Sequence, residues 1–162
     1  MGFLDKLFGN GAKVMEIGAP VEGECVPISA VNDPTFGEEI LGKGIAIRPA
    51  NGLIKAPADG TVTTVFPTGH AVAVTTTEGV EILIHVGLET VELNGDGFTK
   101  HVEEGQEVKK GDLLIEADLV KIGEKYDIIT PMVICNTGDY KEVEGETGKT
   151  VAAGDTVIRI QV

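Results

Sequence analysis

The sequence has little of what several common classes of enzyme need. Tryptophan is absent, and serine occurs once, as Ser29, outside the strand–turn–helix context of a nucleophile elbow, which argues against a hydrolase of the Ser-His-Asp type. Cys25 and Cys135 are the only cysteines and form no CxxC pair. Both lie in apolar runs with nothing nearby that would lower a thiol pKa, so we expect two small core residues in a reducing, cytoplasmic setting.

Long apolar runs are also missing, since none approaches the roughly 20 residues that a membrane-spanning helix requires. The first nine residues, MGFLDKLFG, place their four large apolar side chains at helical spacing. Such a short amphipathic segment contacts the inner face of the membrane peripherally, packs on a neighbour or is a frayed tail. We expect residues 1–13 to form a flexible tail and residues 14–162 a single domain.

The charge and the turn-forming residues indicate a soluble β-protein. The formal net charge of −13 repels nucleic acid, and it either attracts basic partners or serves solubility alone. The 22 glycines and 7 prolines divide the chain into short apolar or alternating segments, so the sequence predicts an all-β fold with short helical turns at residues 36–41 and 118–123. The expected strands are residues 14–19, 24–28, 45–48, 53–56, 61–66, 71–76, 80–86, 113–117, 131–135 and 155–161.

Two pairs of segments repeat within the chain. IGAPVEGECV (17–26) resembles IKAPADGTVTTV (54–65), and EGQEVKKGDLLIEA (104–117) resembles TGKTVAAGDTVIRI (147–160). The second pair shares the spacing G-x2-V-x2-GD throughout. Two copies of each half-motif predict a pseudo-twofold antiparallel β-sandwich or flattened barrel built from duplicated motifs.

The stretch EILIHVGLET contains a histidine within an apolar run. Alternation along a strand places Ile82, Ile84 and Val86 on one face, and Leu83 and His85 on the other. The β-branched face is the better candidate for the core. His85 is therefore expected to be accessible, and a satisfied structural histidine is the alternative.

A second histidine is expected to lie close to the first. His70 follows a turn in FPTGHAVAV, and Thr68 offers a hydroxyl that can orient its ring. If segments 71–76 and 80–86 pair as a hairpin, the numbers of facing residues sum to about 156, which places His70 opposite the neighbour of His85. Strict alternation would instead direct His70 at the core, so the pattern leaves a shared surface open. His101 lies in a polar turn and is expected to be solvated.

Two adjacent imidazoles suit either of two chemistries. Together with a carboxylate they can bind a metal ion. Alternatively, one neutral imidazole accepts a phosphoryl group while the other donates hydrogen bonds to its oxygens. The nucleophile must then donate from its other ring nitrogen to a fixed acceptor, for which a backbone carbonyl near Gly87 is the candidate.

Several strings resemble enzyme IIA of the glucose class from the bacterial phosphoenolpyruvate-dependent sugar phosphotransferase system. The resemblance covers nearly the whole chain from Val14 to Val162. The combination of TGHA with IHVGLETVELNGDGF fifteen residues later is highly specific. The other matching strings are APVEGECVPI, DPTFGEEILGKGIAIRP, APADGTVTTVFPTGHAV, EEGQEVKKGDLL and ITPMVICN.

The resemblance implies a β-sandwich phosphoryl carrier that needs no cofactor. His85 would accept a phosphoryl group from the phosphohistidine of the carrier protein HPr and pass it to a cysteine on the IIB domain of a sugar permease. His70 would stabilise the phosphoryl group and Thr68 would position the ring. No metal is required, although His70 and His85 could bind zinc adventitiously.

The resemblance also implies a partner surface around His85. Asp33 and Glu89 would form its acidic fringe, which suits a basic carrier. The chain resembles the free-standing form, which in some lineages also regulates other sugar-uptake proteins, and in which similar tails are associated with membrane docking. The residues implied for the apolar part of the surface are Thr35, Leu41, Phe66, Val72, Leu83 and Val91.

Three other classes of protein are alternatives to this interpretation. A lipoyl- or biotinyl-type carrier uses similar half-motifs but needs a lysine at an exposed hairpin tip, whereas Lys109 and Lys110 lie inside the glycine repeat. A zinc peptidase would need HxH or HxxxD spacing, which does not occur. A regulatory binding module without phosphoryl transfer is the third.

Overall fold

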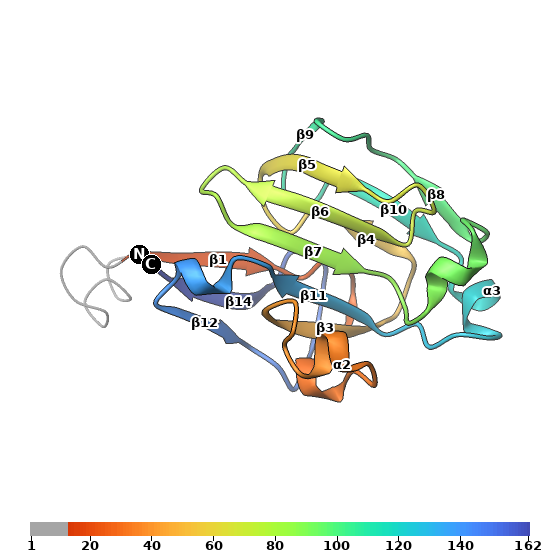
Figure 1. The fold of residues 1–162 in the computed structure, drawn as a ribbon, viewed down its shortest axis with the longest axis horizontal. Coiled ribbons are helices and arrows are strands. Elements are labelled where there is room, and N and C mark those ends of the chain that lie inside the picture. Colours follow the sequence, from red (N-terminus) through yellow and green to blue (C-terminus); the bar gives the residue numbers. More distant parts are fainter. Residues whose placement is uncertain (1–12) are drawn as a thin grey trace.

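Short β-strands make up most of the chain, as the turn residues predict. The computed structural model describes residues 13–162, and every strand pair in it is antiparallel (Figure 1). The strands are β1 (Val14–Gly18), β2 (Gly23–Pro27), β3 (Lys43–Pro49), β4 (Leu53–Lys55), β5 (Gly60–Val65), β6 (Ala71–Thr76), β7 (Glu81–His85), β8 (Phe98–Lys100), β9 (Glu107–Val108), β10 (Leu113–Ala117), β11 (Thr130–Ile134), β12 (Glu142–Gly145), β13 (Lys149–Val151) and β14 (Thr156–Gln161).

Helices are few and short in the described part of the chain. Helix α2 spans Pro34–Gly37, two residues earlier than the turn expected at 36–41, because Asp33 caps it by accepting a hydrogen bond from the Thr35 N–H. Helix α3 spans Leu119–Gly123, and the predicted cap is confirmed, since the Asp118 carboxylate accepts from the Lys121 N–H at 3.1 Å. The 3-10 turns are Ile28–Ala30, Thr90–Leu93 and Thr137–Asp139.

The strands form one large sheet and two small ones. The eight-stranded sheet has the order β13-β2-β3-β11-β7-β6-β5-β9, and the three-stranded sheets have the orders β1-β14-β12 and β4-β10-β8. In Figure 1 the small sheets lie against the large one, so that apolar side chains are enclosed between layers. The predicted antiparallel β-sandwich of duplicated motifs, with only short helical turns, is confirmed.

The predicted internal symmetry appears as an exchange of hydrogen bonds between the two Ala-Pro segments. The Gly18 N–H donates to the Pro57 carbonyl at 2.9 Å, and the Lys55 N–H donates to the Pro20 carbonyl at 2.7 Å. Gly18 and Lys55 occupy matching positions of the repeat, as do Pro20 and Pro57. The two half-motifs therefore interlock reciprocally.

The glycine half-motifs dock on the Ala-Pro segments in the same way in both copies. The Gly111 N–H donates to the Ala56 carbonyl, and the Gly154 N–H donates to the Ala19 carbonyl, both at 2.9 Å. Gly111 and Gly154 have φ angles of +96° and +93°, a conformation that L side chains rarely adopt. The shared geometry explains why the spacing G-x2-V-x2-GD occurs twice.

The aspartates that end these half-motifs offer a test of the symmetry. The Asp112 carboxylate accepts from the Lys109 N–H at 2.8 Å, and the Asp155 carboxylate accepts from the Ala152 N–H at 2.9 Å. Because the two bonds are equivalent, Asp112→Ala and Asp155→Ala are each expected to lower the free energy of unfolding by about 1 kcal/mol. Urea unfolding of the two variants measures this. A loss confined to one variant would contradict the equivalence.

The large sheet buries side chains on both faces. The main core lies on the face that carries Val72, Ile82 and Ile84. The segment before β3 covers part of the opposite face with a smaller apolar cluster, against which Leu83 packs. The buried members of this second cluster are Ile28, Val31, Phe36, Ala46, Leu88, Ile129 and Val133.

Several expectations are corrected or lie outside the described residues. Cys25 is buried as expected, but the core assignment of Cys135 is wrong, because it follows the last residue of β11 and is exposed. Strands β8, β9, β12 and β13 were not expected. No helix within residues 13–162 has the length and apolarity to cross a bilayer. The expected amphipathic segment 1–9 lies outside the described residues.

Candidate functional site

His85 ends strand β7 on the face away from the main core. Ile82 and Ile84 are buried in that core, whereas Leu83 and His85 are half-buried on the other face. The predicted alternation is therefore confirmed. The imidazole lies where the large sheet is only partly covered.

The pairing of β6 with β7 brings His70 to His85, with the predicted register. Ala71 pairs with His85, and the Val86 N–H donates to the His70 carbonyl at 2.7 Å. The two imidazole rings lie edge to face with their centroids 4.9 Å apart. Because the two rings are in direct contact, His70 and His85 share one surface, which the alternation along the strand had left open.

His70 does not follow the alternation of side chains along β6, because it precedes the first residue of that strand. The chain turns just before it, where the Gly69 N–H donates to the Phe66 carbonyl at 2.7 Å. The His70 side chain is only 4% exposed, yet its ring faces His85 and not the core. A turn residue is not bound by the period of the strand that follows it.

Each imidazole is held through its Nδ1 atom. The Nδ1 of His85 lies 2.7 Å from the Gly87 carbonyl, and the Nδ1 of His70 lies 2.5 Å from the Thr68 hydroxyl. Because a carbonyl can only accept, the His85 Nδ1 carries the hydrogen, and the Nε2 of the neutral ring keeps its lone pair. His85 thus has the tautomer that a nucleophilic Nε2 requires.

Burial keeps both rings neutral near pH 7. Desolvation, helped by the neighbouring His85, lowers the pKa of His70 from 6.5 to about 4. Desolvation also lowers the pKa of His85, against the opposing effects of the Gly87 carbonyl and of Asp33. Neutral imidazoles can accept and donate hydrogen bonds or attack phosphorus, whereas protonated ones have no lone pair.

The lowered pKa of His70 gives a measurable dependence on pH. NMR titration of the ring is expected to show a midpoint near pH 4. Between pH 6.5 and 4 the unfolded chain binds more protons than the folded one, so His70 contributes a loss of stability as the pH falls through that window. His70→Gln is expected to reduce this slope in pH-dependent unfolding, and an unchanged slope would contradict the depressed pKa.

Two phenylalanines extend the pair of histidines into a row of four rings. The Phe36 ring lies 5.1 Å from His85, and the Phe66 ring lies 5.3 Å from His70, measured between centroids. Phe36 is buried in the second apolar cluster. Phe66 was expected at the site and Phe36 was not, because only tertiary packing places helix α2 beside β7. Phe36 lies in the string DPTFGEEIL, where no sequence pattern distinguishes it as a site residue.

Most residues of the predicted partner surface are exposed or half-buried. Asp33 lies close enough to act on the charge of His85, and with Glu89 it lines a hollow of about 420 Å³. Val72 is 0% exposed within the main core. Its assignment to the surface is therefore wrong, because in β6 it faces the side opposite His85. The exposed members are Thr35, Leu41, Phe66, Glu89 and Val91, and Asp33 and Leu83 are half-buried.

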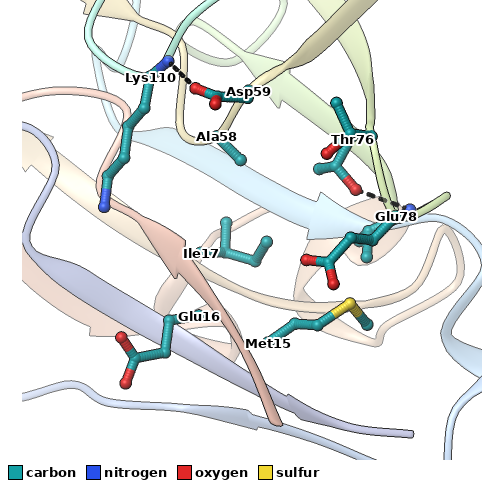
Figure 2. Close-up of a pocket in the computed structure, with 10 residues that line it drawn as sticks. Met15, Glu16, Ile17, Ala58, Asp59, Thr76, Glu78 and Lys110 are labelled. Carbon is teal, nitrogen blue, oxygen red and sulfur yellow. Dashed lines mark hydrogen bonds between the residues drawn. The ribbon is translucent and has the colours of Figure 1, made fainter. Parts of the chain in front are cut away.

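The described structure has no second pair of histidines, since the ring of the remaining histidine, His101, contacts Glu116. Within residues 13–162, no three His, Cys, Asp or Glu side chains are grouped to hold a metal ion. A pocket of about 260 Å³ (Figure 2) lies at the turn end of the β6–β7 hairpin, beside Thr76 and Val80. His70 and His85 lie at the other end of these two strands. The described lining of the pocket includes Met15 and Glu78 but no histidine. The pair of histidines is thus the candidate site.

Comparison with known proteins identifies the family of this chain. Residues 15–140 match the family model described as phosphoenolpyruvate-dependent sugar phosphotransferase system, EIIA 1. The chain belongs to this EIIA family. It is accordingly a phosphotransferase component that acts in sugar phosphotransfer.

Relatives of this EIIA chain support the glucose class. It is 42% identical to the glucose-specific EIIA component of Haemophilus influenzae, over 99% of each chain. Identity to the glucose-specific EIIA component of Oceanobacillus iheyensis is 44%, over 96% of this chain and 94% of that one. A mannose-specific EIIBCA component of Corynebacterium glutamicum is 46% identical over 91% of this chain, which spans 22% of that longer protein.

A solved structure shares the fold of this EIIA chain. The glucose permease IIA from Mycoplasma capricolum superposes with a TM-score of 0.84 at 38% identity, covering 91% of this chain and 96% of that one. Fold and family therefore agree, and the predicted resemblance to the glucose-class EIIA is confirmed.

Proposed function

We propose that His85 is the phosphoryl acceptor of this EIIA component. It takes the group from the phosphohistidine of HPr and passes it to a cysteine on the IIB domain of a glucose-class permease. The observation that carries the proposal is the geometry of the pair: two neutral rings 4.9 Å apart, with the Nδ1 of His85 committed to the Gly87 carbonyl. This leaves one nucleophilic nitrogen beside a second imidazole.

In the first transfer, the Nε2 lone pair of His85 attacks the phosphorus of phospho-HPr. The P–N bond to HPr breaks, its electron pair returns to the HPr imidazole, and a P–Nε2 bond forms on His85. Because Nδ1 keeps its hydrogen, the phosphorylated ring gains positive charge. The Gly87 carbonyl, 2.7 Å away, and the Asp33 carboxylate stabilise that charge.

In the second transfer, a cysteine thiolate of the IIB domain attacks the same phosphorus. The P–Nε2 bond breaks and its electron pair returns to His85, so the ring is neutral again. The existence of an EIIBCA relative supports a IIB partner. Sugar phosphorylation follows on the permease.

His70 stabilises the phosphoryl oxygens, and Thr68 sets its ring. If the Thr68 hydroxyl donates to the His70 Nδ1 across their 2.5 Å contact, the hydrogen of the neutral ring lies on Nε2. That N–H is then available as a donor to the phosphoryl group. A donor fixed before the reaction stabilises the charge on the transferred group without reorganisation.

The surface around the pair suits a basic, partly apolar partner. Leu41, Phe66 and Val91 are 37%, 37% and 47% exposed, so each offers apolar area to a partner. Asp33 and Glu89 add negative charge to the hollow that they line, and the net charge of −13 steers a basic carrier toward the protein. Regulation of other sugar-uptake proteins and membrane contact through residues 1–9 stay predictions from the sequence.

Reconstitution tests the acceptor role directly. The protein is incubated with radiolabelled phosphoenolpyruvate, enzyme I and HPr, and the label is then exposed to acid and to alkali. We expect an acid-labile, alkali-stable label that mass spectrometry locates on His85. Omission of HPr should prevent labelling. An acid-stable label, or a label on His101, would overturn the assignment.

A further inference from the structure

The turn after β7 is held at both edges of its first peptide group. In the Val86–Gly87 peptide, the Gly87 N–H donates to the Ile129 carbonyl at 3.0 Å. The Val86 carbonyl, on the opposite edge, accepts from the Thr90 hydroxyl at 2.5 Å. This peptide group is therefore fixed by the Ile129 carbonyl, just before β11, on one side and by the Thr90 side chain on the other.

The next peptide group supplies the acceptor for His85. The Leu88 N–H donates to the Asp127 carbonyl at 2.9 Å. Because the N–H and C=O of a trans peptide point in opposite directions, the Gly87 carbonyl is directed away from Asp127 and toward the Nδ1 of His85. The orientation of this carbonyl depends on both peptide groups, since they share Gly87.

Thr90 contacts the same turn through its methyl group. Its side chain is 0% exposed. A Cβ added to Gly87, which has φ +77°, would lie only 2.6 Å from the Thr90 Cγ2 and 2.8 Å from the Asp127 carbonyl. The hydroxyl and the methyl group of Thr90 thus act together on Gly87 and its neighbour.

We propose that Thr90 is a positioning residue for phosphoryl transfer. It holds the Val86–Gly87 peptide, which fixes the Gly87 carbonyl and thereby the Nδ1–H tautomer of His85. Without the hydroxyl, the carbonyl loses its alignment and the ring populates the Nε2–H tautomer, whose Nε2 has no lone pair to attack phosphorus. The inference rests on the proposed role of His85 as nucleophile.

The test compares Thr90→Val, which loses the hydroxyl at similar volume, with Thr90→Ser, which keeps it. In Thr90→Val, the ¹⁵N chemical shifts of the His85 ring nitrogens should move toward the Nε2–H tautomer. The rate of phosphorylation by phospho-HPr should fall about ten- to a hundredfold, the range seen when a group that orients a functional residue is lost. Thr90→Ser should keep the wild-type tautomer and come within a few-fold of the wild-type rate.

Thr90→Ala provides a second variant without the hydroxyl, should valine disturb folding. If either folded variant keeps both the wild-type tautomer and the wild-type rate, or if only its melting temperature falls, Thr90 is merely structural and the proposal is overturned. Failure of the wild-type protein to accept phosphate on His85 would instead refute the proposed function. The tautomer measurement on unphosphorylated protein separates the two results.

Discussion

Replacing His85 with alanine is expected to abolish phosphoryl acceptance. Nε2 of His85 is the only nitrogen of this ring left free, because Nδ1 donates to the Gly87 carbonyl, and no covalent intermediate can form without it. Labelling by phospho-HPr should therefore fall by at least about a thousandfold. The measurement is the initial rate of transfer from phosphoenolpyruvate through enzyme I and HPr.

His101→Ala is the matched control for this variant. The His101 ring is exposed and pairs with Glu116 at 2.9 Å, and it belongs to the β8–β10 region, not to the row of rings. It should label at the wild-type rate. Normal labelling of a folded His85→Ala protein would show that the acceptor lies elsewhere.

Replacing His70 with alanine is expected to separate acceptance from onward transfer. The amount of phosphate bound at equilibrium depends on the stability of phosphorylated His85, so the variant should still become labelled. The rate of transfer to a IIB domain depends on stabilising the phosphoryl oxygens in the transition state. Losing one such donor should lower that rate about a hundredfold or more.

Thr68→Val serves as the companion to His70→Ala. It removes the hydroxyl that lies 2.5 Å from the His70 Nδ1 but leaves the imidazole in place. Onward transfer should fall by less than in His70→Ala. The assigned role of His70 would be wrong if His70→Ala kept the wild-type onward rate, or if it failed to accept phosphate at all, as expected for His85→Ala.

The sequence predicted the strands that have a clear pattern. Residues 71–76 and 113–117 were expected as strands and are β6 and β10 with the same bounds. The strands that it missed, such as β9 (Glu107–Val108) and β13 (Lys149–Val151), are two or three residues long and lie at the edges of the large sheet. A segment of two or three residues is too short to show alternation. Such a strand is defined only by its pairing with a neighbouring strand.

The candidate site was predictable where it depends on local pairing. The hairpin register that places residue 70 opposite residue 86 follows from one turn, and the structure has it. Alternation also gave the outward face of His85 correctly. Alternation could not predict the direction of the His70 side chain, because His70 lies in the turn before β6 and not in the strand.

Tertiary packing determines the features of the site that could not be predicted from the sequence. Phe36 contacts His85 only because the segment before β3 folds over the large sheet. Val72 was assigned to the surface from the resemblance, whereas its own strand parity places it with Ile84 in the core. Thr90 lies five residues after His85, and its link to the Gly87 carbonyl depends on how the turn packs against residues 127–129.

The most direct test of the central claim identifies the nitrogen that carries the phosphoryl group. Protein with ¹⁵N-labelled histidine is phosphorylated through HPr, and coupling between ³¹P and the ring nitrogens is recorded by NMR. The hydrogen bond from Nδ1 of His85 to Gly87 predicts coupling to Nε2 of His85, with the hydrogen retained on Nδ1. Coupling to Nδ1 of His85, or to either nitrogen of His70, would contradict the account.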